Sequence, residues 1–285
     1  MARHEFKPTF EPTSQPRSFL YNAYLPFFAV LDMIKLRTRI LLGALIQILL
    51  YAALPTRWAV VPACAMLLHS TCLTVVQLLS PNTKNTFVHG VVPGRVTAQI
   101  PPAGPTPAAH SVVVFNLGVQ YNHPLGPLSP AGRQINRYFD AMRRDLHSRR
   151  HELGLLDMSF WRAGERESNN TLLTTMVFRD IEGLHRFAHE PIHREAWDWW
   201  SGKARSPAYT GVFHETFCVP AGEYETLYVN CRPVLFGRGQ VRMVGGGKDG
   251  EEGQEWRSTL VSADEPALKT QYARMNRRED GTVKG

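Results

Sequence analysis

The sequence predicts an α+β protein in which two apolar N-terminal helices precede one ferredoxin-like βαββαβ domain. Three observations support this: residues 38–80 are apolar and almost uncharged, a proline-rich segment follows them, and from residue 108 onward β-branched runs alternate with stretches of helical spacing. Such changes of texture mark boundaries between structural units. We therefore expect a flexible N-terminal segment, a transmembrane helical hairpin, a proline-rich linker, the ferredoxin-like domain and a disordered tail, over residues 1–37, 38–80, 81–107, 108–235 and 236–285.

The N-terminal segment carries Pro8, Pro12 and Pro16 and shows no apolar period, which predicts a flexible lead-in. Two apolar stretches follow it, residues 40–54 and 58–79, and neither contains a charged side chain. A membrane span needs about 20 apolar residues, which the second stretch reaches and the first approaches. The short turn between them predicts a helical hairpin in a membrane, and a buried hairpin of a soluble protein is the alternative.

Basic residues flank this hairpin: Lys35, Arg37 and Arg39 precede it, and Lys84 follows it. The positive-inside rule then places both outer ends, and with them the ferredoxin-like domain, on the cytoplasmic side, and we expect the endoplasmic reticulum membrane. Arg57 in the turn counts against this orientation. The net charge of +7 comes from scattered residues without a nucleic-acid-binding motif, so a membrane partner is expected and a nucleic-acid partner is not.

The ferredoxin-like domain follows from the order of its predicted elements. The spacing of Ile135, Phe139, Met142 and Leu146 predicts its first helix, with Ser129 as the N-cap. In the ferredoxin-like plan, helices cover one face of an antiparallel sheet. The expected order is strand 111–119, helix 130–153, strands 157–162 and 171–178, helix 181–200, and a final hairpin of strands 212–219 and 225–230.

The segment FAHEPIHREAWDWW is the densest cluster of chemically active side chains. His189 and His193 match the H-E-x-x-H zinc motif, but proline is accepted at the first position of a helix and not inside one. Pro191 therefore places His189 before the helix and His193 in its first turn, so the two rings diverge and no metal site is expected. His193, Trp197 and Trp200 share one helical stripe, which either lines a pocket for a flat apolar ligand or packs as core.

The final predicted hairpin carries a second cluster. Strand alternation places His214 on one face of its first strand, and Tyr228 and Asn230 on one face of its second. Phe213 and Glu215 flank His214, and the group either lines a pocket wall or is a solvated strand face. The chain shows no G-x-G-x-x-G opening a helix after a strand, no P-loop and no G-x-S-x-G, so nicotinamide, ATP and acyl-serine chemistry have no support.

Together the two clusters resemble a family of small fungal and bacterial monooxygenases related to the antibiotic-biosynthesis monooxygenases, of the kind found in fumagillin-type terpenoid clusters of fungi. The resemblance covers roughly residues 105–235. It implies a homodimer in which two ferredoxin-like sheets close into an α/β-barrel, and oxygenation of a secondary metabolite without flavin, haem or metal. By position, the residues that match the family's two motifs are His189, His193, Trp197 and Trp200, and then His214, Glu215, Tyr228 and Asn230.

The leading hypothesis is a membrane-anchored monooxygenase that uses O2, and no cofactor, to oxygenate an apolar terpenoid or polyketide intermediate. His193 is the expected base, with His189 and His214 as further catalytic candidates, because histidine titrates near physiological pH. Tyr228 and Asn230 would hydrogen-bond the developing oxyanion. The expected substrate-binding residues are Trp197, Trp200, Phe213 and Glu215.

Three alternatives keep the same fold. One is a haem-dependent dehydratase in which His189, His193 or His214 ligates the iron, and another is a non-oxidative isomerase or cyclase. The third is a membrane-tethered accessory protein that binds a small molecule without catalysis. In each case a sheet covered by helices on one side leaves an open apolar face, which predicts a homodimer.

Overall fold

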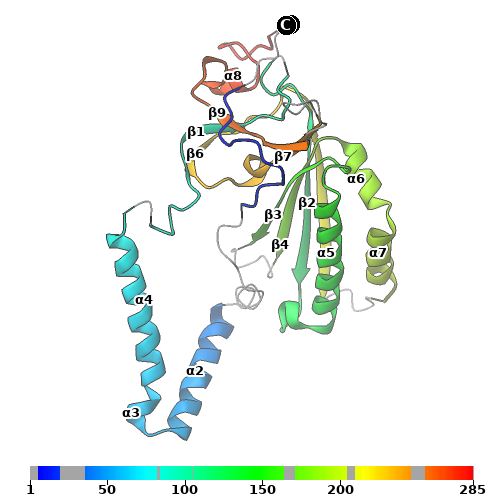
Figure 1. The fold of residues 1–285 in the computed structure, drawn as a ribbon. Helices are drawn as coiled ribbons and strands as arrows, with labels where there is room; N and C mark the ends of the chain where they lie inside the picture. The colour runs from blue at the N-terminus through cyan, green and yellow to red at the C-terminus, as the bar shows by residue number, and fades with distance from the viewer. Residues whose placement is uncertain are drawn as a thin grey trace. The chain divides into compact units, whose positions relative to one another are not determined.

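The computed structural model describes residues 6–19, 36–81, 84–104, 106–163, 171–203, 209–244 and 254–284. The chain divides into two compact units, Leu20–Val91 and the combination of Met1–Phe19 with Val92–Gly285 (Figure 1). The larger unit thus holds chain on both sides of the smaller one. The smaller unit is therefore an insertion in the sequence of the larger unit.

The smaller unit consists of two long apolar helices joined by a short one, namely α2 (Leu36–Ala53), α3 (Thr56–Ala59) and α4 (Val61–Leu79). Gln47 on α2 donates through Nε2 to the carbonyl of Ala59, at 3.1 Å, across the turn. Every residue of α2 and α4 is exposed or half-buried within this unit, and both segments are long and apolar enough to cross a membrane. The two predicted helices are present, and the first begins at Leu36.

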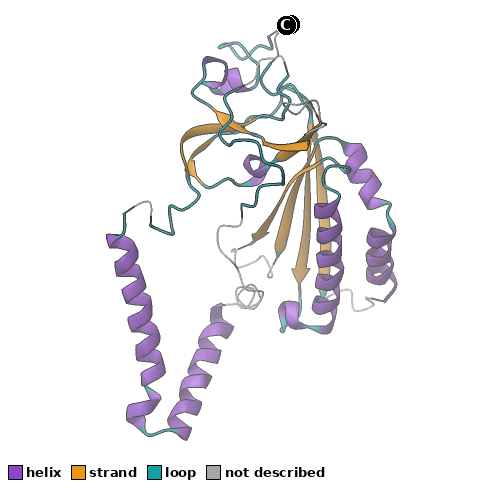
Figure 2. Cartoon of the chain, in the orientation of Figure 1, coloured by secondary structure: helices purple, strands orange, loops and turns teal. Residues whose placement is uncertain are grey.

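A four-stranded antiparallel sheet with strand order β3-β4-β2-β5 forms the framework of the larger unit. The three helices of residues 130–148, 181–188 and 191–203 lie on one face of this sheet (Figures 1 and 2). The βαββαβ order and the position of β2 next to both β4 and β5 confirm the ferredoxin-like prediction. In chain order the elements are β2 (Val112–Tyr121), η1 (Gly126–Leu128), α5 (Pro130–Ser148), β3 (Leu155–Arg162), β4 (Leu172–Phe178), α6 (Ile181–Ala188), α7 (Pro191–Lys203) and β5 (Thr210–Val219).

Capping side chains fix where the helices of this domain begin. Ser129 accepts a hydrogen bond from the backbone N–H of Gly132 at 3.0 Å, which confirms it as the N-cap of α5. Asp180 accepts from the N–H of Gly183 at 2.8 Å and caps α6 in the same way. A Cβ on Gly183 would lie only 2.0 Å from the carbonyl oxygen of Leu153, so only glycine allows α6 to pack this closely.

The main core lies between the helices and the sheet. It holds the apolar positions that the helical and strand periods predict, with Phe178 and Leu153 completely buried. Burial of this apolar surface is the dominant stabilising contribution to the domain, at about 25 cal/mol per Å² removed from water. The buried members are Val113, Leu146, Leu153, Leu155, Met158, Met176, Phe178, Leu184 and Phe187.

A second set of strands lies outside the ferredoxin-like plan, and of its members the sequence predicts a strand only at residues 225–230, which overlaps residues 228–231 of the structure. A three-stranded sheet has the order β6-β1-β9, and a separate pair is formed by β7 and β8. The bounds are β1 (Val92–Ala98), β6 (Tyr228–Cys231), η3 (Leu235–Arg238), β7 (Gln240–Val244), β8 (Gln254–Ser258), β9 (Leu260–Ser262), η4 (Pro266–Leu268) and α8 (Gln271–Arg274).

The predicted final hairpin of residues 212–219 and 225–230 is wrong. β5 pairs with the central strand β2 over its full length, whereas β6 pairs with β1 in the other sheet. Two energetic gains explain this choice. β5 completes a ten-residue ladder against β2, and Tyr228 on β6 packs against the apolar cluster of Val92, Val96 and Leu260.

The proline-rich linker over residues 81–107 is wrong where it includes β1. This strand is the centre of its sheet, and Val96 and Ala98 are buried at 6% and 0% exposure. The flexible N-terminal segment over residues 1–37 is wrong for residues 6–19. There Thr13 exchanges two backbone hydrogen bonds with Trp256, at 3.1 and 2.7 Å. Residues 1–5, 20–35, 82–83 and 105 lie outside the described residues.

The disordered tail over residues 236–285 is wrong for residues 236–244 and 254–284. Leu260 and Leu268 are buried at 1% and 0% exposure, and the buried Arg274 forms an ion pair with Glu225 at 2.5 Å. Leu260 packs with Val92 and Val96, and Leu268 packs with Phe6, so both are buried through contacts with distant segments that no local period in the sequence indicates. Residues 245–253 and 285 lie outside the described residues.

These added strands change the second face of the main sheet. Val112, Leu156 and Val177 on that face form a common buried cluster with residues that the added segments contribute: Ala98, Ile100, Phe236 and Val241. The face is therefore partly covered by the chain itself, which the ferredoxin-like plan alone does not anticipate.

Candidate active site

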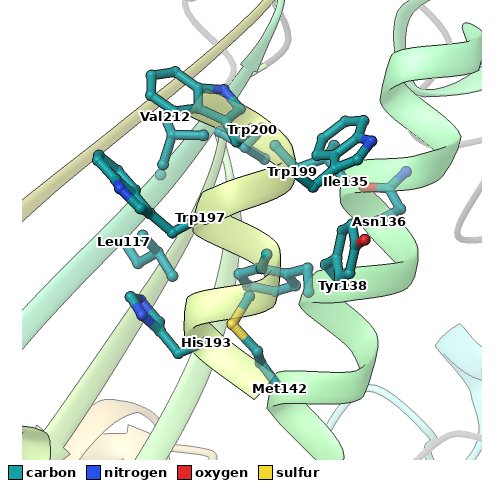
Figure 3. A pocket seen from close by; sticks show the side chains of 14 residues that line it. Leu117, Ile135, Asn136, Tyr138, Met142, His193, Trp197, Trp199, Trp200 and Val212 are labelled. Carbon is teal, nitrogen blue, oxygen red and sulfur yellow. The ribbon is translucent and has the colours of Figure 1, made fainter. Parts of the chain in front are cut away.

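A pocket lies between the helices and the sheet of the ferredoxin-like domain, where the sequence predicts a site for a flat apolar ligand. One wall is α5, the opposite wall is α7, and the floor is formed by β2 and β5 (Figure 3). The pocket is predominantly apolar, which suits a hydrocarbon-rich ligand. Its lining residues are Leu117, Gly118, Val119, Ile135, Asn136, Tyr138, Phe139, Met142, His193, Ala196, Trp197, Trp199, Trp200 and Val212.

A helix break places the first catalytic candidates. The single helix expected over residues 181–200 is wrong, because α6 ends at Ala188, His189 is its C-cap, and α7 begins at Pro191. The predicted start of the helix at Pro191 is thus confirmed, since proline fits the first helical position. The exposed His189 stays at the end of α6, while His193 lies in the first turn of α7 and lines the pocket.

His193 has surroundings that keep its imidazole neutral. The ring is half-buried and lies edge-on to Phe187, with centroids 5.8 Å apart. Burial lowers the pKa of His193 below its usual 6.5, a hydrogen bond to the backbone of Ala188 opposes this, and the charges of His214 and His189 lower it further. A neutral imidazole with one nitrogen bonded to a carbonyl keeps the other as a proton acceptor. His193 can therefore act as a base.

Three tryptophans form the α7 wall. Trp197 and Trp200 lie with ring centroids 5.4 Å apart, and Trp199 packs on Tyr138 of α5 at 5.5 Å. Their large aromatic faces give the pocket an apolar lining at little cost in side-chain entropy. Trp197 is 53% exposed, so it stands at the mouth of the pocket.

The structure brings His214 near His193 but does not place it in the lining. His214 pairs with Leu117 across the β2–β5 ladder, and its ring lies 5.7 Å from that of Phe115. Both neighbours belong to the helix-covered face of the sheet. His214 therefore shares a face with the pocket and contributes to the electrostatics of His193.

Phe213 and Glu215 lie on the opposite face from His214, as alternation along β5 requires. Phe213 pairs with Gly118, and a Cβ there would meet its ring at 2.0 Å. The expectation that Phe213 and Glu215 bind substrate together with the tryptophans is wrong for this pocket, because the sheet separates the two groups.

Tyr228 and Asn230 are also not brought to the pocket. The hydroxyl of Tyr228 accepts a hydrogen bond from the N–H of Gly237 at 2.9 Å, and the side-chain carbonyl of Asn230 accepts from the N–H of Gly94 at 2.8 Å. Both residues are on β6, which pairs with β1 and not with β5. Their expected role as oxyanion donors beside His193 fails for the same reason as the predicted hairpin.

Asn136 and Tyr138 of α5 and Tyr121 of β2 belong to the site, although the sequence did not identify them as candidates. The buried hydroxyl of Tyr121 donates to the side-chain carbonyl of Asn136, and burial raises the pKa of Tyr121 to about 12, so the phenol stays protonated. Asn136 and Tyr138 line the pocket beside the apolar stripe of α5. The apolar stripe predicts only which face of α5 is buried. Whether that face lines a pocket depends on how far α7 lies from α5, which the sequence does not give.

Within the described ranges, no group of three or more histidine, cysteine, aspartate or glutamate side chains is placed to hold a metal ion. Of the three histidines considered as haem ligands, His193 is the one that lines the pocket. It is therefore the residue that would hold a haem in this pocket.

Comparison with solved structures finds partial likenesses. A cofactor-independent oxygenase from Streptomyces nogalater, SnoaB, is 15% identical, with 38% of this chain and 92% of that chain covered and a TM-score of 0.26. An aldoxime dehydratase in complex with butyraldoxime is 15% identical, with 66% and 46% covered and a TM-score of 0.37.

Comparison of sequences is more decisive. Residues 112–236 match the family model described as Monooxygenase af470-like. The protein named Monooxygenase af470 from Aspergillus fumigatus is 46% identical over 275 residues, which are 95% of this chain and 98% of that protein. Identity at this level over nearly the whole length shows that the chain belongs to the af470-like family of monooxygenases and is an oxygenase enzyme.

Proposed function

We propose that this enzyme is a membrane-anchored, cofactor-independent monooxygenase that oxygenates an apolar, enolisable terpenoid or polyketide intermediate of secondary metabolism. The observation that carries the proposal is His193, a half-buried neutral imidazole at the edge of a pocket walled by tryptophans. A base in apolar surroundings and a flat apolar cavity are what proton removal from such a substrate requires.

The proposed reaction needs no external reductant. His193 takes a proton from a carbon beside a carbonyl, and the resulting carbanion passes one electron to O2. The substrate radical and superoxide combine into a C–O bond, and the peroxide takes up a proton. Loss of the remaining hydrogen of that carbon as a proton, with cleavage of the O–O bond, gives a ketone and water. A CH2 group and O2 thus become a C=O group and H2O, and the substrate supplies all four electrons.

Two further features of the pocket support this chemistry. Trp197 and Trp200 keep water away from the carbanion, which protonation would quench. Asn136 uses its carbonyl to accept from Tyr121, so its amide N–H groups are left for an oxygen of the substrate. We assign to Asn136 the stabilisation of developing oxyanion charge, in place of Tyr228 and Asn230.

The membrane part of the proposal rests on α2 and α4. α2 carries no charged residue from Ile40 onward, α4 carries none at all, and the two helices have 18 and 19 residues. At 1.5 Å per residue each helix is about 27–29 Å long, close to the ~30 Å of a bilayer core. With Arg37 and Arg39 in the first turn of α2 and Lys84 after α4, we propose an endoplasmic reticulum hairpin with the catalytic unit in the cytoplasm.

The base is tested by His193→Gln with His185→Gln as a matched control, since His185 is exposed on α6 and outside the pocket. Metabolite extracts of strains with the gene, without it, and with each variant identify the product. His193→Gln should lower product formation by about 10²–10⁴-fold, the usual worth of a general base. Wild-type yield from His193→Gln would end the proposed mechanism.

The cofactor question has its own test. Purified enzyme stripped of metal should keep its activity and consume one O2 per product. Haem absorbance that rises and falls with activity across preparations would instead favour the haem alternative, with His193 as ligand.

A further inference from the structure

An ion-pair network joins the end of α5 to the start of α7, outside the pocket itself. Arg149 binds Asp145 with two hydrogen bonds, at 3.1 and 2.7 Å. Its other side binds Glu190 with two more, one at 2.7 Å from Nη1 and one from Nη2. Arg149 also lies 3.4 Å from the more exposed Glu152. We refer to Arg149, Asp145 and Glu190 as the Arg149 network.

Glu190 is the residue through which the Arg149 network reaches the active site. Its backbone carbonyl accepts the first hydrogen bonds of α7, from the N–H of His193 at 3.1 Å and of Arg194 at 3.0 Å. It lies between the end of α6 and Pro191, where the helix is broken. A side chain held at this position fixes the origin of α7, and His193 is only three residues further along.

The Arg149 network is more buried and has more hydrogen bonds than an ordinary ion pair on a protein surface. Its three members are 26–27% exposed in their side chains, and both carboxylates are bound through paired N–H donors. The hydrogen bonds of Glu190 and then Asp145 raise the pKa of Arg149. Paired guanidinium–carboxylate contacts are among the stronger and more directional ion pairs, whereas exposed single pairs contribute little.

The same helix carries a contrasting ion pair. Arg144 binds Asp140 one turn earlier, its side chain is 66% exposed, and the pair lies wholly within α5. Loss of Arg144 removes a positive charge from α5 without touching α7. It is therefore a matched control for Arg149.

We propose that Arg149 and Glu190 are positioning residues of the oxygenase, which hold the first turn of α7 against α5 and thereby keep the ring of His193 buried at the pocket. This inference rests on the proposed function, in which His193 is the base. The pocket walls are α5 and α7, so the Arg149 network sets their separation at the His193 end. The groups that act on His193 from neighbouring elements are His189 at the end of α6 and His214 on β5.

The test uses full-length protein in detergent micelles, with carbon-13 histidine labels and no substrate. The variants are Arg149→Met and Glu190→Gln, and Arg144→Gln is the control. His193→Gln identifies the His193 signal. Two quantities are measured, the titration of the His193 ring and the hydrogen exchange of the amides of α6 and α7.

In Arg149→Met and Glu190→Gln, the amides of α7 should exchange about fivefold faster or more, with α6 unchanged. His193 should titrate at higher pH, nearer its usual 6.5, because it becomes less buried. Arg144→Gln should match the wild type in both quantities. Glu190→Gln keeps its shape and a hydrogen-bond acceptor, so it gives an answer even if Arg149→Met misfolds.

Wild-type titration and exchange in Glu190→Gln would overturn the inference, as would equal effects from Arg144→Gln. Failure of the proposed function has a different signature. In that case product formation survives His193→Gln, while the Arg149 network variants still shift the His193 titration.

Discussion

At the scale of single residues, the protonation of His193 makes the first prediction. Only the neutral ring accepts a proton, and burial lowers its pKa, so the active form persists below pH 6.5. The turnover rate should therefore rise with pH through a midpoint below 6.5 and stay level above it. Initial rates from about pH 4.5 to 8 at constant ionic strength check this. A midpoint above pH 6.5 would mean that the group whose protonation determines the rate is not a buried histidine with a lowered pKa.

Two glycines give a paired prediction of stability. Gly183→Ala would push a methyl group to within 2.0 Å of the Leu153 carbonyl oxygen, so α6 must shift, at a cost of about 1–3 kcal/mol in unfolding free energy. Gly202→Ala on α7 meets nothing within 4 Å and should stabilise by up to about 1 kcal/mol through helix propensity. Denaturant unfolding of both variants tests the packing of α6. Equal effects from the two substitutions would contradict it.

At the scale of elements, the sequence predicts the helices and strands that local interactions determine. The stripe of α5, its Ser129 cap and the proline start of α7 give the helices, and alternation gives β2 to β5. Tyr228 and Asn230 fail because the partner of a four-residue strand is chosen by distant contacts, here with Val92 and Val96 of β1. Asn136 could not be predicted as a site residue for the same reason, because its place in the pocket depends on how close α7 lies to α5.

The insertion of α2 to α4 makes a prediction about which parts of the chain fold without the others. Phe19, where the chain leaves the larger unit, is close to Phe10 at 5.9 Å between rings, and Phe10 packs with the cluster containing Val92, where the chain returns. Replacement of residues 20–91 by a short glycine–serine linker should therefore give a folded protein. A fragment of residues 105–240 lacks β1, β8, β9 and all but the first residue of β7, and it should aggregate, because the cluster of Val112, Leu156 and Val177 loses part of its cover.

Fractionation measures the outcome. The full-length chain should stay in a membrane pellet through carbonate and high salt, while the linker variant should move to the supernatant with a cooperative thermal transition. Release of the full-length chain by salt alone would show that only charges hold it to the membrane.

At the scale of the whole molecule, the second face of the main sheet makes a prediction about assembly. The chain's own strands cover Val112 and Val177, but a row across the sheet remains open: Trp161 and Phe213 are 40% and 38% exposed, joined through Leu173 and Gly118, and Phe217 is 50% exposed. The row from Phe213 to Trp161 is apolar and exposed at both ends, with Glu215 between Phe213 and Phe217 on the same face, and an exposed apolar row is typical of an interface.

The expected partner for this row is a second copy, related by a two-fold axis that places the two rows against each other. The linker variant should show twice the monomer mass by light scattering at micromolar concentration. Phe213→Asp should shift it to the monomer, because a charge would be buried without a partner at the centre of the interface. Tyr272→Asp, at a 44% exposed aromatic on α8, should leave the dimer intact. A well-folded monomer before any substitution would show that the open row has another use.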